Sequence, residues 1–211
     1  MIESSAVVMP QEPNAWRGPL SSTYGEGAFD DVIAAGVLLD VSRLVSGLLG
    51  LARPAVGARS ERVTRLAREL VAALDLEGAW EFEVAARLSQ IGWLAVPDAT
   101  QQAAWRGEPL SEEDWRAVLS HPLVARDMLE DVTRLEGVRE MIARQQEPVA
   151  VRGEAPRSVR HDRHALGGQI LRVCTELDAL MQAGLTRTAA LDRMRAQPLE
   201  FDQMLVTLLA G

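Results

Sequence analysis

Apolar residues recur every three or four positions through most of this chain, which is the spacing of one face of an α-helix. The first such stripe consists of Val37, Val41, Leu44, Leu48 and Leu51. Later segments repeat the period, with stripes at Val63, Leu66, Ala67, Leu70 and Leu74, at Trp115, Val118 and Leu119, at Val124, Met128, Val132 and Leu135, and at Leu166, Ile170, Val173, Cys174, Leu177 and Met181. Because no segment alternates with the period of two that a β-strand requires, the sequence predicts an all-α helical bundle.

The first stripe admits two structural roles. We interpret it as a core stripe that completes the bundle of one molecule, because about two heptads fall short of the three or four that indicate a coiled coil. The alternative is that the helix of residues 32–52 pairs two protomers into a homodimer. A membrane span is not expected, because Asp40, Arg43 and three glycines interrupt this segment.

Turn-forming residues divide the chain. Residues 1–28 contain several Pro, Gly and Ser and no sustained apolar period, which predicts a flexible N-terminal extension. The helical domain is expected to cover residues 29–211, with one irregular insert at 147–164. Ser111 and Thr186 are predicted to cap helix N-termini, and Pro122 is predicted to lie in the first turn of a new helix.

The charged residues exclude several functions. The 211-residue chain has 30 acidic and 22 basic residues, a net charge of -8, which disfavours binding to nucleic acid or to anionic membranes. Every basic residue is Arg, so no chemistry that needs a lysine is available. The single cysteine, Cys174, precludes an intrachain disulfide and falls on an apolar stripe, so we expect it to be buried in a protein of the reducing cytoplasm.

Five segments carry a further signal through their order and spacing. They are Arg59-Ser60-Glu61-Arg62-Val63, Leu88-Ser89-Gln90-Ile91-Gly92-Trp93 followed by Val96-Pro97-Asp98, Leu110-Ser111-Glu112-Glu113-Asp114-Trp115 through Ser120-His121-Pro122, Arg144-Gln145-Gln146-Glu147, and the run from Ile170 to Leu180. They resemble, in turn, H-S-x-R-V, L-H-D-I-G-K…I-P-D, L-T-x-E-E-W…x-H-P, H-H-E and I-L-x-V-A-D-A-F-D-A-L. These are motifs of the HD-GYP domains, helical phosphodiesterases of the HD superfamily that hydrolyse cyclic di-GMP at a centre of metal ions.

The resemblance implies an HD-domain-like bundle and, residue by residue, a lost active site. It places the family's metal ligands and phosphate-binding lysine at Arg59, Ser89, Gln90, Trp93, His121, Gln145, Gln146 and Thr175. Of these, His121 alone keeps the family's residue type. Arginine has no lone pair for a metal, and serine and glutamine do not replace imidazole and bridging carboxylate. We therefore expect no catalytic residues, no metal and no cofactor, with Trp93 filling the former pocket.

The resemblance then predicts a catalytically inactive regulatory or scaffolding protein that acts through protein-protein contacts in bacterial signalling. Two alternatives stay open. The first is a nonhydrolytic cyclic-dinucleotide sensor, in which Arg152, Arg157, Arg160 and Arg163 of the insert grip phosphates. The second is a divergent phosphohydrolase with relocated ligands at His121, His161, Asp162 and His164, although Asp162 or His161 at a helix N-cap is the interpretation we prefer.

Overall fold

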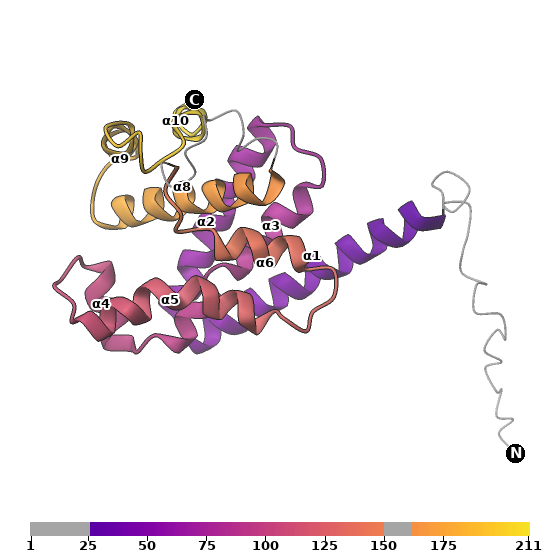
Figure 1. Cartoon of the computed structure of the whole chain (residues 1–211), viewed down its shortest axis with the longest axis horizontal. Helices are drawn as coiled ribbons and strands as arrows, with labels where there is room; N and C mark the ends of the chain where they lie inside the picture. The colour runs from indigo at the N-terminus through magenta and orange to yellow at the C-terminus, as the bar shows by residue number, and fades with distance from the viewer. Residues whose placement is uncertain (1–25, 150–161) are drawn as a thin grey trace, which may run out of the picture. The chain divides into compact units, whose positions relative to one another are not determined.

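The computed structural model describes residues 26–149 and 162–211, and its side chains from residue 31 onward. These residues form helices without a strand among them, as the apolar period predicts (Figure 1). The helices are α1 (Glu26–Ala52), α2 (Pro54–Ala73), α3 (Ala79–Leu88), the short 3-10 helix η2 (Ile91–Ala95), α4 (Asp98–Trp105), α5 (Glu112–Met128), α6 (Glu136–Ala143), α8 (Arg163–Gln182), α9 (Arg187–Arg195) and α10 (Gln203–Leu208).

The chain divides into two units, residues 1–37 and 38–211. In the first unit, the described part is the beginning of α1, which starts at Glu26, before the predicted domain start at residue 29. The predicted flexible extension, residues 1–28, lies almost wholly outside the described residues. In the second unit, α2 packs on α3 and α8, and α6 packs on α3, α5 and α8. Their apolar faces form one core, and α9 and α10 lie beside α8 (Figure 1).

Helix α1 corrects the prediction of a core stripe. Of its apolar residues, Val41, Leu44, Leu48 and Leu51 are exposed, whereas Ser42, Ser46 and Leu49 are buried. The small residues of α1 allow a close approach to α2: a Cβ added at Gly57 would lie 2.4 Å from the Cα of Gly50. The side of α1 that faces the core instead carries Leu38, Leu39, Val45 and Leu49 together with the two serines.

Helix α1 also has the length and hydropathy of a membrane span over residues Asp31–Ala52, as core helices and leader segments do too. The burial of Leu49 in the core ties the C-terminal half of α1 to the helical domain.

Helix α5 differs from the prediction at two points. It runs through Pro122 without a break, so Pro122 does not begin a new helix. Trp115, which we assigned to packing, is half exposed, as are Leu119 and Met128, while Val118 is buried. The reason is that η2 and α6 cover only one side of α5.

The predicted helix caps are confirmed. The hydroxyl of Ser111 accepts a hydrogen bond from the Asp114 N–H (3.1 Å), and that of Thr186 accepts one from Ala189 (3.2 Å). Cys174 is fully buried as predicted, and burial raises the pKa of its thiol. Each of these features depends on a local pattern, which the sequence displays directly.

Candidate functional site: a buried polar cluster

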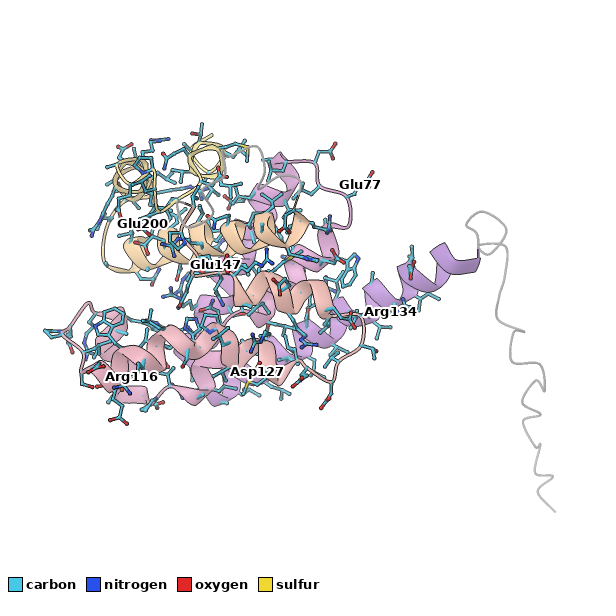
Figure 2. The ribbon with its side chains drawn as sticks, viewed as in Figure 1. Glu77, Arg116, Asp127, Arg134, Glu147 and Glu200 are labelled. Atoms are coloured by element: carbon cyan, nitrogen blue, oxygen red, sulfur yellow. The ribbon has the colours of Figure 1, made fainter. Side chains whose placement is uncertain are left out.

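The ends of several helices bring together most of the residues that the family resemblance singled out. Arg59 lies on α2, Ser89 and Gln90 follow α3, His121 lies on α5 and Gln145 follows α6. All five are buried, and we call them the polar cluster. Trp93 of η2 is buried beside them, whereas Gln146 and Thr175 are only partly buried. By contrast, Arg116 and Asp127, two charged residues of α5 that Figure 2 labels, are exposed.

Arg59 places a positive charge in the interior. Its Nη2 donates to the backbone carbonyl of Thr175 at 3.2 Å, and its guanidinium carbon lies 5.1 Å from the ring centroid of Trp105. Burial lowers the pKa of Arg59, an effect that the carboxylate of Asp178 opposes. Because a guanidinium stays protonated in proteins, the structure holds a buried cation where the resemblance places a metal ligand.

Asp178 pairs with Arg62 and lies beside Arg59, so one carboxylate is shared by two guanidinium groups. Our reading of the sequence missed this role of Asp178 and Arg62. The Arg62 Nε donates to one Asp178 oxygen at 2.5 Å and its Nη2 donates to the other at 3.2 Å. Arg59 Nη1 lies 3.9 Å from the same carboxylate, which is almost fully buried. Both residues occur in segments that resemble family motifs. Arg62 corresponds to the arginine of the first motif and Asp178 to the second aspartate of the last motif, and this correspondence is the sequence signal that could have identified them.

Three aromatic rings line the centre of this region. Trp93 stacks on His121 with ring centroids 4.5 Å apart, and Trp105 meets Trp93 edge to face at 5.4 Å. The Trp93 side chain is buried, as expected, and its filling of a former pocket stays a prediction. Trp105 was not singled out from the sequence, since nothing beyond its residue type distinguished it there. Its indole connects Arg59 to the Trp93 and His121 pair.

Proline 122 explains how His121 is held. A proline has no N–H, so it leaves the carbonyl four residues earlier, that of Val118, without its helical donor. The Nδ1 of His121 lies 2.7 Å from this carbonyl oxygen, and donation from Nδ1 leaves Nε2 as an acceptor. Burial lowers the pKa of His121 to about 4, which favours this neutral form.

Gly92 permits η2 to pack directly on this part of α5. A Cβ at position 92 would lie 1.8 Å from the His121 carbonyl oxygen, closer than any side chain allows. Gly92 corresponds to the glycine of the family's L-H-D-I-G-K motif, and the structure gives a reason for a glycine there. It sets the distance between the η2 backbone and α5, and with it the stacking of Trp93 on His121.

The remaining members of the cluster form a chain of neutral hydrogen bonds. Gln90 Nε2 donates to the Ser89 hydroxyl at 2.9 Å, which donates to the Ala86 carbonyl at 2.9 Å. Gln145 Nε2 donates to the Ser89 carbonyl at 3.4 Å. The Oε1 atoms of Gln90 and Gln145 and the Nε2 of His121 have no hydrogen-bond partner within the part of the chain that the structure describes.

The donors of this cluster do not fit a centre of several divalent metal ions. Such a centre needs imidazoles and carboxylates that share the ions. The cluster supplies one imidazole nitrogen, two amide oxygens and a buried cation. Across residues 26–149 and 162–211, no group of three or more His, Cys, Asp or Glu is arranged to hold a metal ion.

Residues 162–164, at the end of the predicted insert, have a structural role. Asp162 caps α8, since its Oδ1 accepts from the N–H groups of His164 and Ala165 at 3.0 Å, and its other oxygen lies 2.9 Å from Arg144. His164 lies beside Gly137 of α6. The preferred interpretation of Asp162 as an N-cap is confirmed. His161 lies outside the described residues.

Arg163, one of the four arginines assigned to ligand binding, contacts α3. It donates to Glu81 at 2.6 Å and to the Gly78 carbonyl at 2.7 Å, and it covers the ring of Phe82 at 4.5 Å. Arg152, Arg157 and Arg160 lie outside the described residues. Another site residue of the resemblance, Gln146, uses its backbone carbonyl to accept from Arg172.

A shallow cavity of about 200 Å³ lies next to the polar cluster. Arg59, Arg62 and Trp105 line it, together with small residues of α2 and α8. It gives access to the outer face of the Arg59 guanidinium, while the Trp93 and His121 rings are not part of its wall.

A comparison with family models matched residues 43–205 of the chain to the model described as HD domain. This range contains the whole polar cluster and the segments that resemble family motifs. A comparison with curated proteins found no match.

Proposed function

Because the chain belongs to the HD domain family, whose members are often phosphohydrolases, we propose that it is a non-catalytic member of the HD-GYP type. In this proposal it is a cytoplasmic regulatory or scaffolding protein that acts through protein-protein contacts in bacterial signalling. The observation that carries the proposal is Arg59: a buried guanidinium, which shares the carboxylate of Asp178 with Arg62, occupies the position at which the resemblance puts the family's first metal-ligating histidine.

Electrostatics favour this reading over hydrolysis. Metal-assisted phosphodiester hydrolysis depends on ions that lower the pKa of bound water and neutralise charge in the transition state, worth several kcal/mol. A fixed positive charge in the cluster repels the cations that the reaction needs. The stacked rings of Trp93 and His121 also occupy space beside the one imidazole that remains.

Exposed apolar residues support a role in protein contacts. Trp115 and Leu119 lie one turn apart on the outer side of α5, and each is at least half exposed. Tryptophan is enriched among the residues that dominate binding energy at interfaces. A surface of this kind gives an inactive domain a means of acting on other proteins.

Metal loading and hydrolysis test the proposal together. The full chain is incubated with Mn²⁺ or Fe²⁺, freed of excess ion, analysed by mass spectrometry for metal, and assayed with bis-p-nitrophenyl phosphate and cyclic di-GMP. We expect far less than one ion per chain and no hydrolysis above the blank. Near-stoichiometric metal with hydrolysis that disappears in His121→Ala would overturn the proposal.

Calorimetry with cyclic di-GMP separates the scaffold from the nonhydrolytic sensor. We expect no heat of binding at high micromolar ligand. Binding that disappears on substitution of Arg157 and Arg160 by Ala would favour the sensor instead. The variant Arg126→Ala, which removes an arginine of α5, serves as the matched control for loss of positive charge.

A further inference from the structure

The C-terminal half of α1 exposes a continuous apolar surface. Its four residues, Val41, Leu44, Leu48 and Leu51, are between 48 and 82% exposed, and we call them the α1 stripe. An apolar groove of about 360 Å³ adjoins the stripe, lined by Leu48 of α1, Leu94 of η2 and Met128 of α5. Stripe and groove together form one patch of a kind that soluble monomers rarely expose.

The same helix also has a side that packs on the domain. Leu49 is buried there with Ser42 and Ser46, and Leu38, Leu39 and Val45 pack against the core. The Ser42 hydroxyl donates to the Leu39 carbonyl at 2.7 Å, which satisfies it within the helix. The α1 stripe is therefore a second apolar face, beyond the one that the domain already covers.

The spacing of the stripe matches a second copy of itself. Residues 41, 44, 48 and 51 alternate steps of three and four, the a and d positions of a heptad, so two such helices interdigitate. Asp40 and Arg43 flank the stripe, and their side chains pair with each other at 2.8 Å within one helix. The contact surface therefore carries no unpaired like charges that would oppose symmetric association.

The size of the patch is consistent with such a contact. From the exposed fractions of the four stripe residues with Leu94 and Met128, it presents on the order of 600 Å² per molecule, close to the roughly 800 Å² per partner of a standard interface. Two heptads are short for an isolated coiled coil, but here the domain already holds α1 and the groove accepts further side chains.

We propose that the α1 stripe and its groove form a symmetric interface between two copies of this chain. The charge of the protein argues against a lipid surface as the occupant. Helices that lie on membranes carry Lys and Arg around their apolar face, whereas this protein has a net charge of -8, no lysine, and Asp40 beside the stripe. The inference does not depend on whether the polar cluster is catalytic.

Sedimentation velocity of the full chain over about a hundredfold range of concentration tests the interface. We expect a dimer that dissociates on dilution. In the double variant Leu44→Gln with Leu48→Gln, which changes four side chains per dimer, the dissociation constant should rise by at least about a hundredfold. Leu199→Gln is the matched control, because Leu199 is 68% exposed against 64% for Leu44 and lies outside α1.

Circular dichroism tests whether each variant is folded. We expect that it is, because both leucines are exposed. A monomer at every concentration would overturn the proposal, and so would a dimer whose dissociation constant is equal in wild type and double variant. Cosedimentation with vesicles of phosphatidylcholine and phosphatidylglycerol, present in wild type and lost in the double variant, would overturn it in favour of a lipid surface.

Discussion

Single residues define the polar cluster, and each acts through a specific physical effect. Pro122 removes one backbone donor, and the freed Val118 carbonyl fixes the orientation of His121. Gly92 allows η2 to approach the α5 backbone. Arg59 brings a permanent positive charge into the interior. At neutral pH a neutral histidine would bring no charge there, and an aspartate would bring a negative one.

The buried imidazole predicts a pH dependence of stability. The pKa of His121 is about 4 in the folded protein against an ordinary value of 6.5, so the unfolded chain takes up a proton first as the pH falls. The free energy of unfolding should be unaffected above about pH 6.5 and should decrease between pH 6.5 and 4, by up to roughly 1.4 kcal/mol per pH unit. Urea unfolding across this range should show a shallower decrease in His121→Gln.

His164→Gln provides the control for this pH prediction, because it also removes one imidazole but from a partly exposed position. It should retain the wild-type slope. Identical slopes for wild type and His121→Gln would mean that His121 is not a neutral buried group.

The contact at Gly92 predicts a large effect of one methyl group. Gly92→Ala places a Cβ 1.8 Å from the His121 carbonyl oxygen, so η2 or α5 must shift, at a cost of about 3 kcal/mol in the free energy of unfolding. Gly47→Ala, in open space on α1, should instead stabilise by about 0.5–1 kcal/mol through helix propensity. Chemical denaturation of both variants measures the difference, and equal stabilities would contradict the packing described here.

At the scale of single helices, contacts between helices outweigh the preferences of the local sequence. Helix α1 turns Ser42, Ser46 and Leu49 toward the domain and leaves the predicted stripe exposed, and helix α5 continues through a proline because His121 satisfies the freed carbonyl. Helices α2 and α8 are joined by Asp178, which accepts from Arg62 and faces Arg59. This last contact ties the two longest helices of the second unit together through buried charge.

The α2 and α8 contact predicts an asymmetric response to charge removal. Asp178→Asn removes the buried carboxylate that Arg59 and Arg62 share, and the free energy of unfolding should fall by about 3–5 kcal/mol. Asp192→Asn removes the partner of Arg195 in an exposed pair on α9, and it should change stability by less than about 0.5 kcal/mol. Thermal and urea unfolding distinguish the two, and a mild effect of Asp178→Asn would show that the pair is dispensable.

At the scale of the whole molecule, net charge and apolar surface act in opposite directions. Two copies of a chain with charge -8 repel each other, whereas the α1 stripe attracts a second copy without using ion pairs. The range of the repulsion depends on salt, from about 30 Å at 0.01 M to about 8 Å at 0.15 M ionic strength. The apolar attraction has no such dependence at these concentrations.

Salt therefore provides a fourth prediction. The dissociation constant of the α1 dimer should decrease when NaCl is raised through this range, because screening removes repulsion and leaves apolar burial intact. Light scattering at fixed protein concentration follows the change. Dissociation by added salt would indicate an interface held by ion pairs, contrary to the surface described here.

The sequence alone determined the features that depend on neighbouring residues. The apolar period predicted helices, and the residue types at 111 and 186 predicted caps, because both effects act within one or two turns. Motif order and spacing predicted a member of the HD superfamily, which the match to the HD domain model confirms, and grouped Arg59, Ser89, Gln90, His121 and Gln145, which are all buried. The HD-GYP type stays a prediction. The loss of activity that those residue types imply remains a prediction.

Tertiary structure decided what a periodic pattern leaves open. A stripe of leucine and valine shows which residues share a helix face, but whether that face is buried depends on what packs against the helix. On α1 the side that packs carries Leu49, Ser42 and Ser46 rather than the predicted stripe. The contacts of Asp178 with Arg62 and Arg59 were likewise not visible in the sequence. Arg62 and Asp178 lie 116 positions apart and meet only when α2 and α8 pack. Burial and ion pairing are properties of contacts between distant segments, and a local pattern does not contain them.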